Sequence, residues 1–212
     1  MNDPLKKMKV RFSSTQQERS QKTLQDLLQA AESIVETGDA DQFDARTLSK
    51  LSGYSLGSLV KRLGKIENIF LHIIAQGRTR EIGKIAQQLN ELDTTIEPRQ
   101  LVEKFSDLAF NAIEKVNPSV IRYYEKRATI RADSLATVYA YIEEIVSPLL
   151  NLMEINQSGL YRKLDVVEAR YICRSIFLFI ERPYVEGDPI AGSERHKQIV
   201  VENITRLLIA EK

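Results

Sequence analysis

Residues 46–65, with the sequence RTLSKLSGYSLGSLVKRLGK, constrain the fold of this chain more than any other segment. Apolar residues recur at helical spacing in two groups, and Gly53 separates the groups. The pattern predicts two short helices joined by a tight turn. Four leucines are expected to pack in a core beneath these helices: Leu48, Leu51, Leu59 and Leu63. Every charged side chain of the segment is basic: Arg46, Lys50, Lys61, Arg62 and Lys65.

An apolar inner face, a glycine at the bend and a cationic outer face are the parts of a helix-turn-helix, whose basic side chains bind phosphates. The surrounding charge agrees with this interpretation. Residues 1–22 carry six basic and two acidic side chains, whereas residues 23–45 carry six acidic side chains and no basic one. Segments that face DNA are expected to be basic and the opposite face acidic. Chance clustering of solvated charges is the alternative explanation.

Composition limits the other function classes. Hydrophobic residues make up 43% of the 212 residues, which is enough for a packed core. The sequence predicts a cytoplasmic protein, because it has one cysteine, no signal-peptide pattern and no long apolar run. It contains only two histidines. No metal-binding or nucleophile pattern and no phosphate-binding glycine loop is visible in the sequence. We therefore expect neither an enzyme nor a metal or cofactor site.

The rest of the chain also has helical periodicity and no strand alternation, so an all-α fold of about nine helices is predicted. Residues 1–16 are expected to form a flexible basic arm, 17–65 a three-helix head, and 66–212 a helical body. Within the body, Pro148 predicts a kink or break near Ser147. The helices expected outside the central pair are 17–37, 66–89, 99–116, 119–131, 132–153, 165–180 and 193–210.

Between Gln17 and Phe70 the sequence resembles the tetracycline-repressor (TetR) family of bacterial transcription regulators. The similarity is carried by Ala30-Ala31 and Gly38 in and after the first helix, by Thr47 at the start of the second, and by three short motifs. These motifs are SKLSGYS at 49–55, LGSLVKRL at 56–63 and IENI at 66–69. Leu56, Val60 and Ile66 differ from the residues that the family usually has at these positions.

The resemblance implies a dimer that binds palindromic operator DNA as a regulator, and we expect a repressor that a small molecule releases. Within the head, nine residues are the predicted DNA contacts, with Tyr54 expected to be exposed: Arg46, Thr47, Tyr54, Ser55, Gly57, Ser58, Lys61, Arg62 and Lys65. Double-stranded DNA is bound through phosphates at helix N-termini and basic side chains, and through base edges.

In the body, the family's small-molecule pocket predicts six ligand-binding candidates: Phe105, Tyr123, Tyr124, Arg127, Tyr139 and Phe177. The homodimer is expected to form through 165–182 and 193–210, with completion of the monomer core as the alternative use of these helices. The alternative function is a helical interaction protein whose degenerate helix-turn-helix no longer binds specific DNA. Operator sequence, effector and direction of regulation do not follow from the sequence.

Overall fold

A computed structural model describes residues 14–131 and 140–210. Over these residues the chain is helical, and its β pairing is limited to an isolated bridge between Tyr161 and Ile209. The predicted all-α class is confirmed. Residues 1–13 of the predicted arm and most of the N-terminal part of the predicted helix 132–153 lie outside the described residues.

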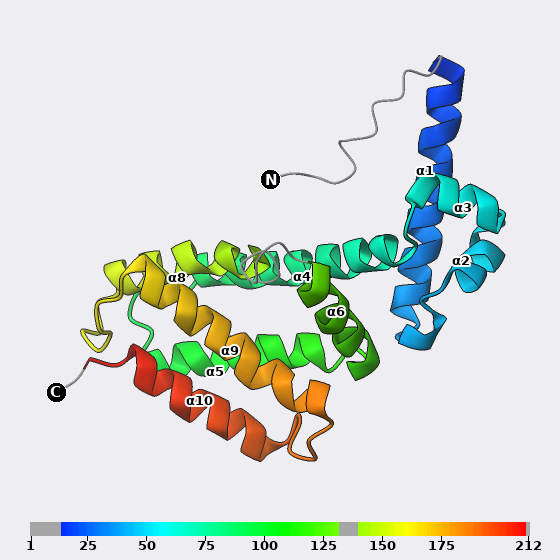
Figure 1. The fold of residues 1–212 in the computed structure, drawn as a ribbon. Helices are drawn as coiled ribbons and strands as arrows, with labels where there is room; N and C mark the ends of the chain where they lie inside the picture. Colours follow the sequence, from blue (N-terminus) through cyan, green and yellow to red (C-terminus); the bar gives the residue numbers. More distant parts are fainter. Residues whose placement is uncertain (1–13, 132–139, 211–212) are drawn as a thin grey trace. The chain divides into compact units, whose positions relative to one another are not determined.

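Nine α-helices are described (Figure 1): α1 (Ser14–Glu36), α2 (Ala45–Ser52), α3 (Leu56–Leu63), α4 (Glu67–Asn90), α5 (Pro98–Ile113), α6 (Pro118–Arg131), α8 (Glu143–Ile155), α9 (Val166–Glu186) and α10 (Glu194–Leu208). Two single 3-10 turns accompany them, η2 (Ala40–Gln42) and η3 (Ala140–Ile142). None of the described helices is both long enough and apolar enough to cross a membrane.

Contacts divide the described chain into two compact units. The head comprises residues 14–37 and 41–73, and the body comprises residues 38–40 and 74–210. The boundary falls within α4, between Ile73 and Ile74. Because α1 begins at Ser14, residues 14–16, predicted to belong to the arm, are part of this helix.

The head is a three-helix unit in which α1 packs on α2, and α2 on α3. Its core contains the apolar stripe of α1 and the inward side chains of the two short helices: Leu27, Ala31, Ile34, Leu48 and Leu59. Beneath the loop after α1, the ring of Phe43 stacks on Phe70 with centroids 4.9 Å apart. Burial of this large apolar area holds the two short helices in place, since each is too short to be stable alone.

Leu51 corrects the predicted core of the head, because 55% of its surface is exposed. It lies in the last turn of α2, two residues before the turn glycine Gly53, while Leu48 makes the buried contact of that helix. Leu63, also predicted as core, is only partly buried.

The body is a helical bundle in which α9 packs on α5, α6, α8 and α10, and α5 packs on α10. Leu207 is exposed, whereas ten apolar residues of the two helices expected at the dimer surface lie in the monomer core: Ala169, Ile172, Cys173, Ile176, Phe177, Ile180, Val200, Val201, Ile204 and Leu208. These ten side chains therefore complete the core of the monomer, and a dimer through 165–182 and 193–210 stays a prediction. A different set of apolar side chains on α9 is exposed, including Val167, Tyr171, Leu178 and Phe179.

Two prolines lie inside helices rather than at their ends. Pro148 is within α8, so the helix does not break near Ser147, and a kink there stays a prediction. Pro183 is within α9, which continues to Glu186 instead of ending at Ile180 as predicted. A proline in a helix removes the N–H that would bond to the carbonyl four residues earlier. For Pro183 that carbonyl is Phe179 O, which lies 2.8 Å from Nε2 of His196 on α10.

Candidate nucleic-acid interface

The two short helices of the head are each fixed by a side-chain cap and separated by a left-handed turn. Asp44 caps α2 and Ser55 caps α3, where its hydroxyl accepts the N–H of Ser58 at 3.3 Å. Gly53 ends α2 with φ of 74°, in the left-handed region that favours glycine. Its N–H donates to Ser49 O. This local chemistry produces the predicted pair of short helices, with Gly53 at the predicted turn.

Asp44 occupies the N-terminus of α2. Its carboxylate accepts the N–H of Arg46 at 2.6 Å, and it accepts both the N–H and the hydroxyl of Thr47 at 3.0 Å. The hydrogen bond from the Thr47 N–H is the largest cause that lowers the pKa of Asp44 below its usual value. The N–H and the hydroxyl of Thr47, a predicted DNA contact, are thus both engaged by Asp44. A phosphate at this helix end has to compete with Asp44.

Tyr54 is half-buried, which corrects its expected exposure at the turn. Its hydroxyl donates to Asp26 of α1 at 2.7 Å, and its carbonyl accepts the Ser49 hydroxyl at 2.6 Å. These bonds tie the turn to α1 and to α2. Tyr54 therefore supports the position of α3, and its hydroxyl is directed to the protein.

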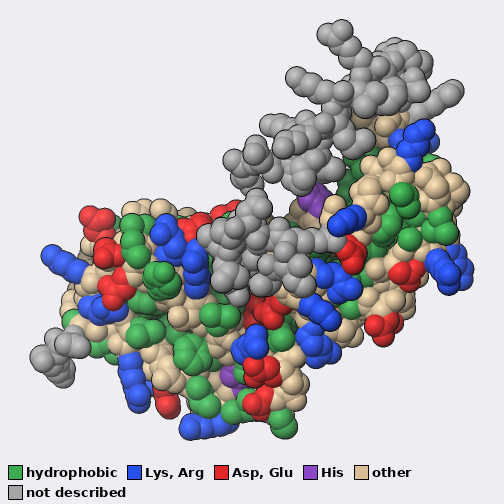
Figure 2. Space-filling view, in the orientation of Figure 1, with side chains coloured by type: hydrophobic (Ala, Val, Ile, Leu, Met, Phe, Trp, Pro, Cys, Tyr) green, Lys and Arg blue, Asp and Glu red, His purple; other side chains and the backbone are tan. Residues whose placement is uncertain are grey.

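Arg62 is also turned toward α1. Its Nη1 donates to the Ser20 hydroxyl at 3.0 Å and to the Ser20 carbonyl at 3.4 Å. The other four basic side chains of the segment are exposed: Arg46, Lys50, Lys61 and Lys65. The head therefore carries exposed basic side chains on α2, on α3 and just after α3, and Figure 2 shows basic groups scattered over the visible face of the protein.

The start of α3 is open to solvent. Gly57 is exposed, and a Cβ added there would meet no atom within 4 Å. Ser55 and Ser58 lie beside it with their hydroxyls 3.0 Å apart. Two apolar residues of the same helix are exposed as well, Leu56 at 45% and Val60 at 57%. Small, hydroxyl and apolar groups thus share the outer surface of α3 with Lys61.

Two ring contacts join predicted ligand residues of the body. Phe105 and Phe177 meet edge to face with centroids 6.1 Å apart, and the guanidinium of Arg127 lies 4.0 Å from the ring centre of Tyr123. Phe105, Tyr123, Tyr124 and Phe177 are all buried. Tyr139 lies outside the described residues.

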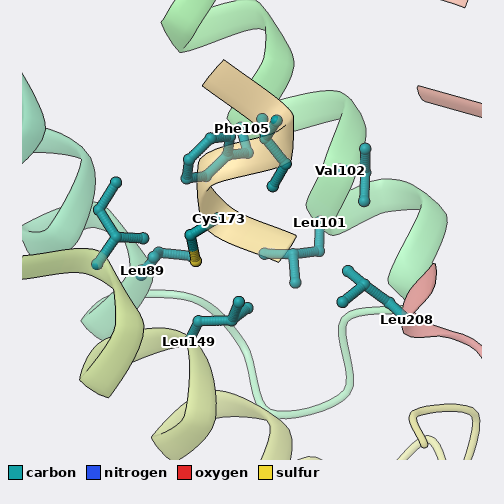
Figure 3. Close-up of a pocket in the computed structure, with 9 residues that line it drawn as sticks. Leu89, Leu101, Val102, Phe105, Leu149, Cys173 and Leu208 are labelled. Carbon is teal, nitrogen blue, oxygen red and sulfur yellow. The ribbon is translucent and has the colours of Figure 1, made fainter. Parts of the chain in front are cut away.

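A narrow cavity in the body is lined by apolar side chains from five helices, α4, α5, α8, α9 and α10 (Figure 3). The cavity volume is about 20 Å³, which is room for about one water-sized group. Phe105 is the predicted ligand residue that reaches it, and the other lining residues are Leu89, Leu101, Val102, Ile145, Leu149, Cys173, Ile176 and Leu208. Burial raises the pKa of the Cys173 thiol to about 12, so the cavity wall is uncharged at neutral pH.

Sequence reasoning missed Arg78 of α4, whose guanidinium carbon lies about 5 Å from the ring centres of both Tyr124 and Tyr141. Arg78 forms an ion pair with Glu181 of α9. Burial works against its charged form, but the charge of Glu181 prevails and holds the pKa of Arg78 above its usual value. The sequence does contain a signal for this buried arginine. Arg78 is four residues after Ile74 and four before Ile82, so it is a charged residue on an apolar helix face.

Among the described residues there is no group of three or more His, Cys, Asp or Glu side chains that could hold a metal ion.

No protein-family model matches the chain, and no curated protein sequence matches it. Several solved structures, in contrast, are similar to this chain. One, from Mesorhizobium loti MAFF303099, is assigned to the TetR family of transcriptional regulators; it is 15% identical and covers 91% of this chain and 99% of its own, with a TM-score of 0.62.

A second structure, from Shewanella sp. PV-4, is also assigned to the TetR family of transcription regulators. It is 13% identical and covers 89% of this chain and 99% of its own, with a TM-score of 0.57. The chain is thus a helix-turn-helix head joined to a helical body. More specifically, it has the fold of TetR-family transcriptional regulators, which confirms at the level of the fold the resemblance found in its sequence.

Proposed function

We propose that this chain is a DNA-binding transcriptional regulator of the bacterial cytoplasm and not an enzyme. The observation that carries the proposal is the head itself. Two capped helices and a glycine turn are held by α1, and they present Arg46, Lys50, Lys61 and Lys65 to solvent. A cationic helix pair of this kind binds the phosphates on either side of a major groove and places its second helix in that groove.

The regulator is proposed to act as a homodimer, because one helix-turn-helix contacts few base pairs. The exposed side of α9 supports this part of the proposal. Val167, Tyr171 and Leu178 are spaced four and seven residues apart, which places them on one face of the helix, and all three are exposed. An apolar stripe of this kind on a helix is typical of a subunit interface. Helix α9 thus remains the proposed interface, through residues other than those first predicted.

A small-molecule effector is proposed to bind the body and to release the DNA, so that the regulator acts as a repressor. The proposed entry point is the apolar cavity next to Phe105 and Cys173, which would have to widen from about 20 Å³ to admit such a molecule. Its lining favours an apolar effector over the anionic one that Arg127 would suggest. The effector shifts the protein between conformations only by its difference in affinity for them.

The test is binding of the full-length chain to a fluorescent duplex that spans the DNA upstream of its own gene, measured at several salt concentrations. Specific binding with a steep salt dependence is expected, since each phosphate neutralised contributes about one unit to the slope. Lys61→Gln combined with Lys65→Gln should lower that slope by about two. Lys115→Gln changes an exposed lysine of the body and serves as the control.

The alternative function is a helical interaction protein with a degenerate head. Exposure of Leu51, Leu56 and Val60 favours it, because apolar side chains at the surface of a head suit a protein partner. Equal affinity for unrelated duplexes, or a salt slope unchanged by the two lysine substitutions, would support this alternative and contradict the regulator.

A further inference from the structure

The outer face of α3 carries exposed apolar side chains beside its basic ones, and the proposed phosphate contacts do not explain these apolar side chains. Leu56 and Val60 are four residues apart and therefore lie one above the other on this face. Both are largely exposed, whereas Leu59, on the inner side of the same helix, is fully buried. Leu56 and Val60 thus do not belong to the core of the head.

The groups around this apolar pair limit what can cover it. Between Leu56 and Val60 the helix carries Gly57, where no atom lies within 4 Å of an added Cβ, so a partner can approach the backbone closely. Lys61 is the next residue and is exposed, as is Lys65 just after the helix. No acidic residue occurs between 45 and 66. The partner must therefore be anionic and must also offer small apolar groups.

The major groove of DNA meets both requirements. Its phosphates are anionic, and the C5-methyl group of thymine is the apolar group that it exposes. We propose that Leu56 and Val60 recognise thymine methyl groups, and that these two side chains make the binding site selective for thymine at the positions they cover. This inference rests on the proposed function, since it takes α3 to be the helix that enters the groove.

The test begins with the full-length chain and a library of duplexes with a randomised centre, from which bound sequences are enriched. Each thymine of the enriched duplex is then replaced by deoxyuridine, which pairs identically but lacks the methyl group. We expect at least one replacement in each half-site to weaken binding about fourfold, as for loss of one buried methyl-sized group.

Variants identify the side chains responsible. Val60→Ala and Leu56→Ala should weaken binding to the thymine duplex, and each should lose its response to deoxyuridine at the position that its own side chain covers. Val116→Ala removes the same groups as Val60→Ala from an exposed site in the body, and it should bind like the unaltered chain. Because both head residues are exposed, the variants should melt at the temperature of the unaltered chain.

The outcomes separate the inference from the proposed function. Enrichment of a specific duplex together with equal affinity for its deoxyuridine forms overturns the thymine inference and leaves the regulator in place. The absence of any enriched duplex overturns both. A change in oligomeric state on Val60→Ala or Leu56→Ala, with DNA affinity unchanged, assigns the face to protein contacts and also overturns the inference.

Discussion

Cys173 shows how the environment of one residue sets its chemistry. Its side chain is fully buried against the apolar cavity of the body. Burial is the main cause that raises the pKa of its thiol to about 12, and the nearby charge of Glu143 adds to it. Because the thiolate is the reactive form, a thiol with this pKa is almost entirely unreactive at neutral pH.

We therefore predict that native protein does not react with an aromatic disulfide reagent at pH 8, and that it releases one equivalent of thiolate once unfolded in guanidinium chloride. The measurement is absorbance of the released thiolate against time. An apolar effector that opens the cavity should speed the reaction. Fast labelling of the free native protein would contradict the burial of Cys173.

Asp44 gives a second prediction at the residue scale. Its folded-state pKa lies below the ordinary value of 3.8, so its contribution to stability is present above that pH and is lost as the pH falls through the lowered pKa. Asp44→Ala should cost about 1 kcal/mol at pH 7, the usual effect of losing an N-cap. The measurement is chemical unfolding of the unaltered chain and of Asp44→Ala at several pH values from neutral to acid. The difference in unfolding free energy between the two should shrink only at the acid end.

The matched control for that experiment is Asp44→Asn, which keeps an acceptor oxygen for the N–H groups of Arg46 and Thr47 but cannot titrate. Its stability relative to Asp44→Ala should not depend on pH. A gap between Asp44→Ala and the unaltered chain that stays constant down to the lowest pH would argue against the charged cap.

At the scale of elements, α9 continues through Pro183 because another helix repairs the defect. His196 of α10 is buried, and its Nε2 donates to the Phe179 carbonyl that Pro183 leaves without a helical donor. Its Nδ1 accepts the N–H of Gly192 at 3.1 Å. These two partners require a neutral imidazole with its proton on Nε2. The ring also packs edge to face on Phe110, with centroids 4.9 Å apart.

We predict that His196→Leu destabilises the protein by about 1–3 kcal/mol, because it leaves a carbonyl without its donor. In a Pro183→Ala background the restored N–H of residue 183 can bond to the Phe179 carbonyl. There the same substitution should cost about 1 kcal/mol less. Chemical unfolding of the four proteins measures the difference, and strictly additive costs would rule out the repair.

These elements also show how far the sequence determines the outcome. Periodicity and the turn glycine were sufficient for α2 and α3, because these signals lie within a few residues of each other. The helix predicted at 165–180 ended short of Pro183, since nothing in the nearby sequence indicates that His196 supplies the missing donor. The sequence analysis gave Arg78 no role, and it expected Tyr54 to be exposed. Their partners, Glu181 and Asp26, are distant in sequence, and only the folded chain brings them together.

At the scale of the whole molecule, the proposed homodimer requires a surface through which two copies can associate. Most apolar residues of α9 and α10 are buried in the core of the body, whereas apolar residues on the outer face of α9 are exposed. This face is therefore the proposed contact surface for a second copy. Tyr171 is the most exposed of its apolar side chains, at 63%, and Leu178 lies two turns further along the same face. A second copy that supplies the same face would bury both stripes around a two-fold axis.

Charges placed on this face should therefore separate the copies. We predict that Tyr171→Glu and Leu178→Glu each shift the protein from the mass of two chains to that of one in light scattering after gel filtration, because a buried unpaired carboxylate is strongly unfavourable. Val116→Glu, at an exposed site between α5 and α6, should remain dimeric. Since a monomer offers one head to a two-fold operator, the α9 variants should also bind the enriched duplex about 10²-fold more weakly or worse. Variants that stay dimeric and bind normally would place the interface elsewhere on the body.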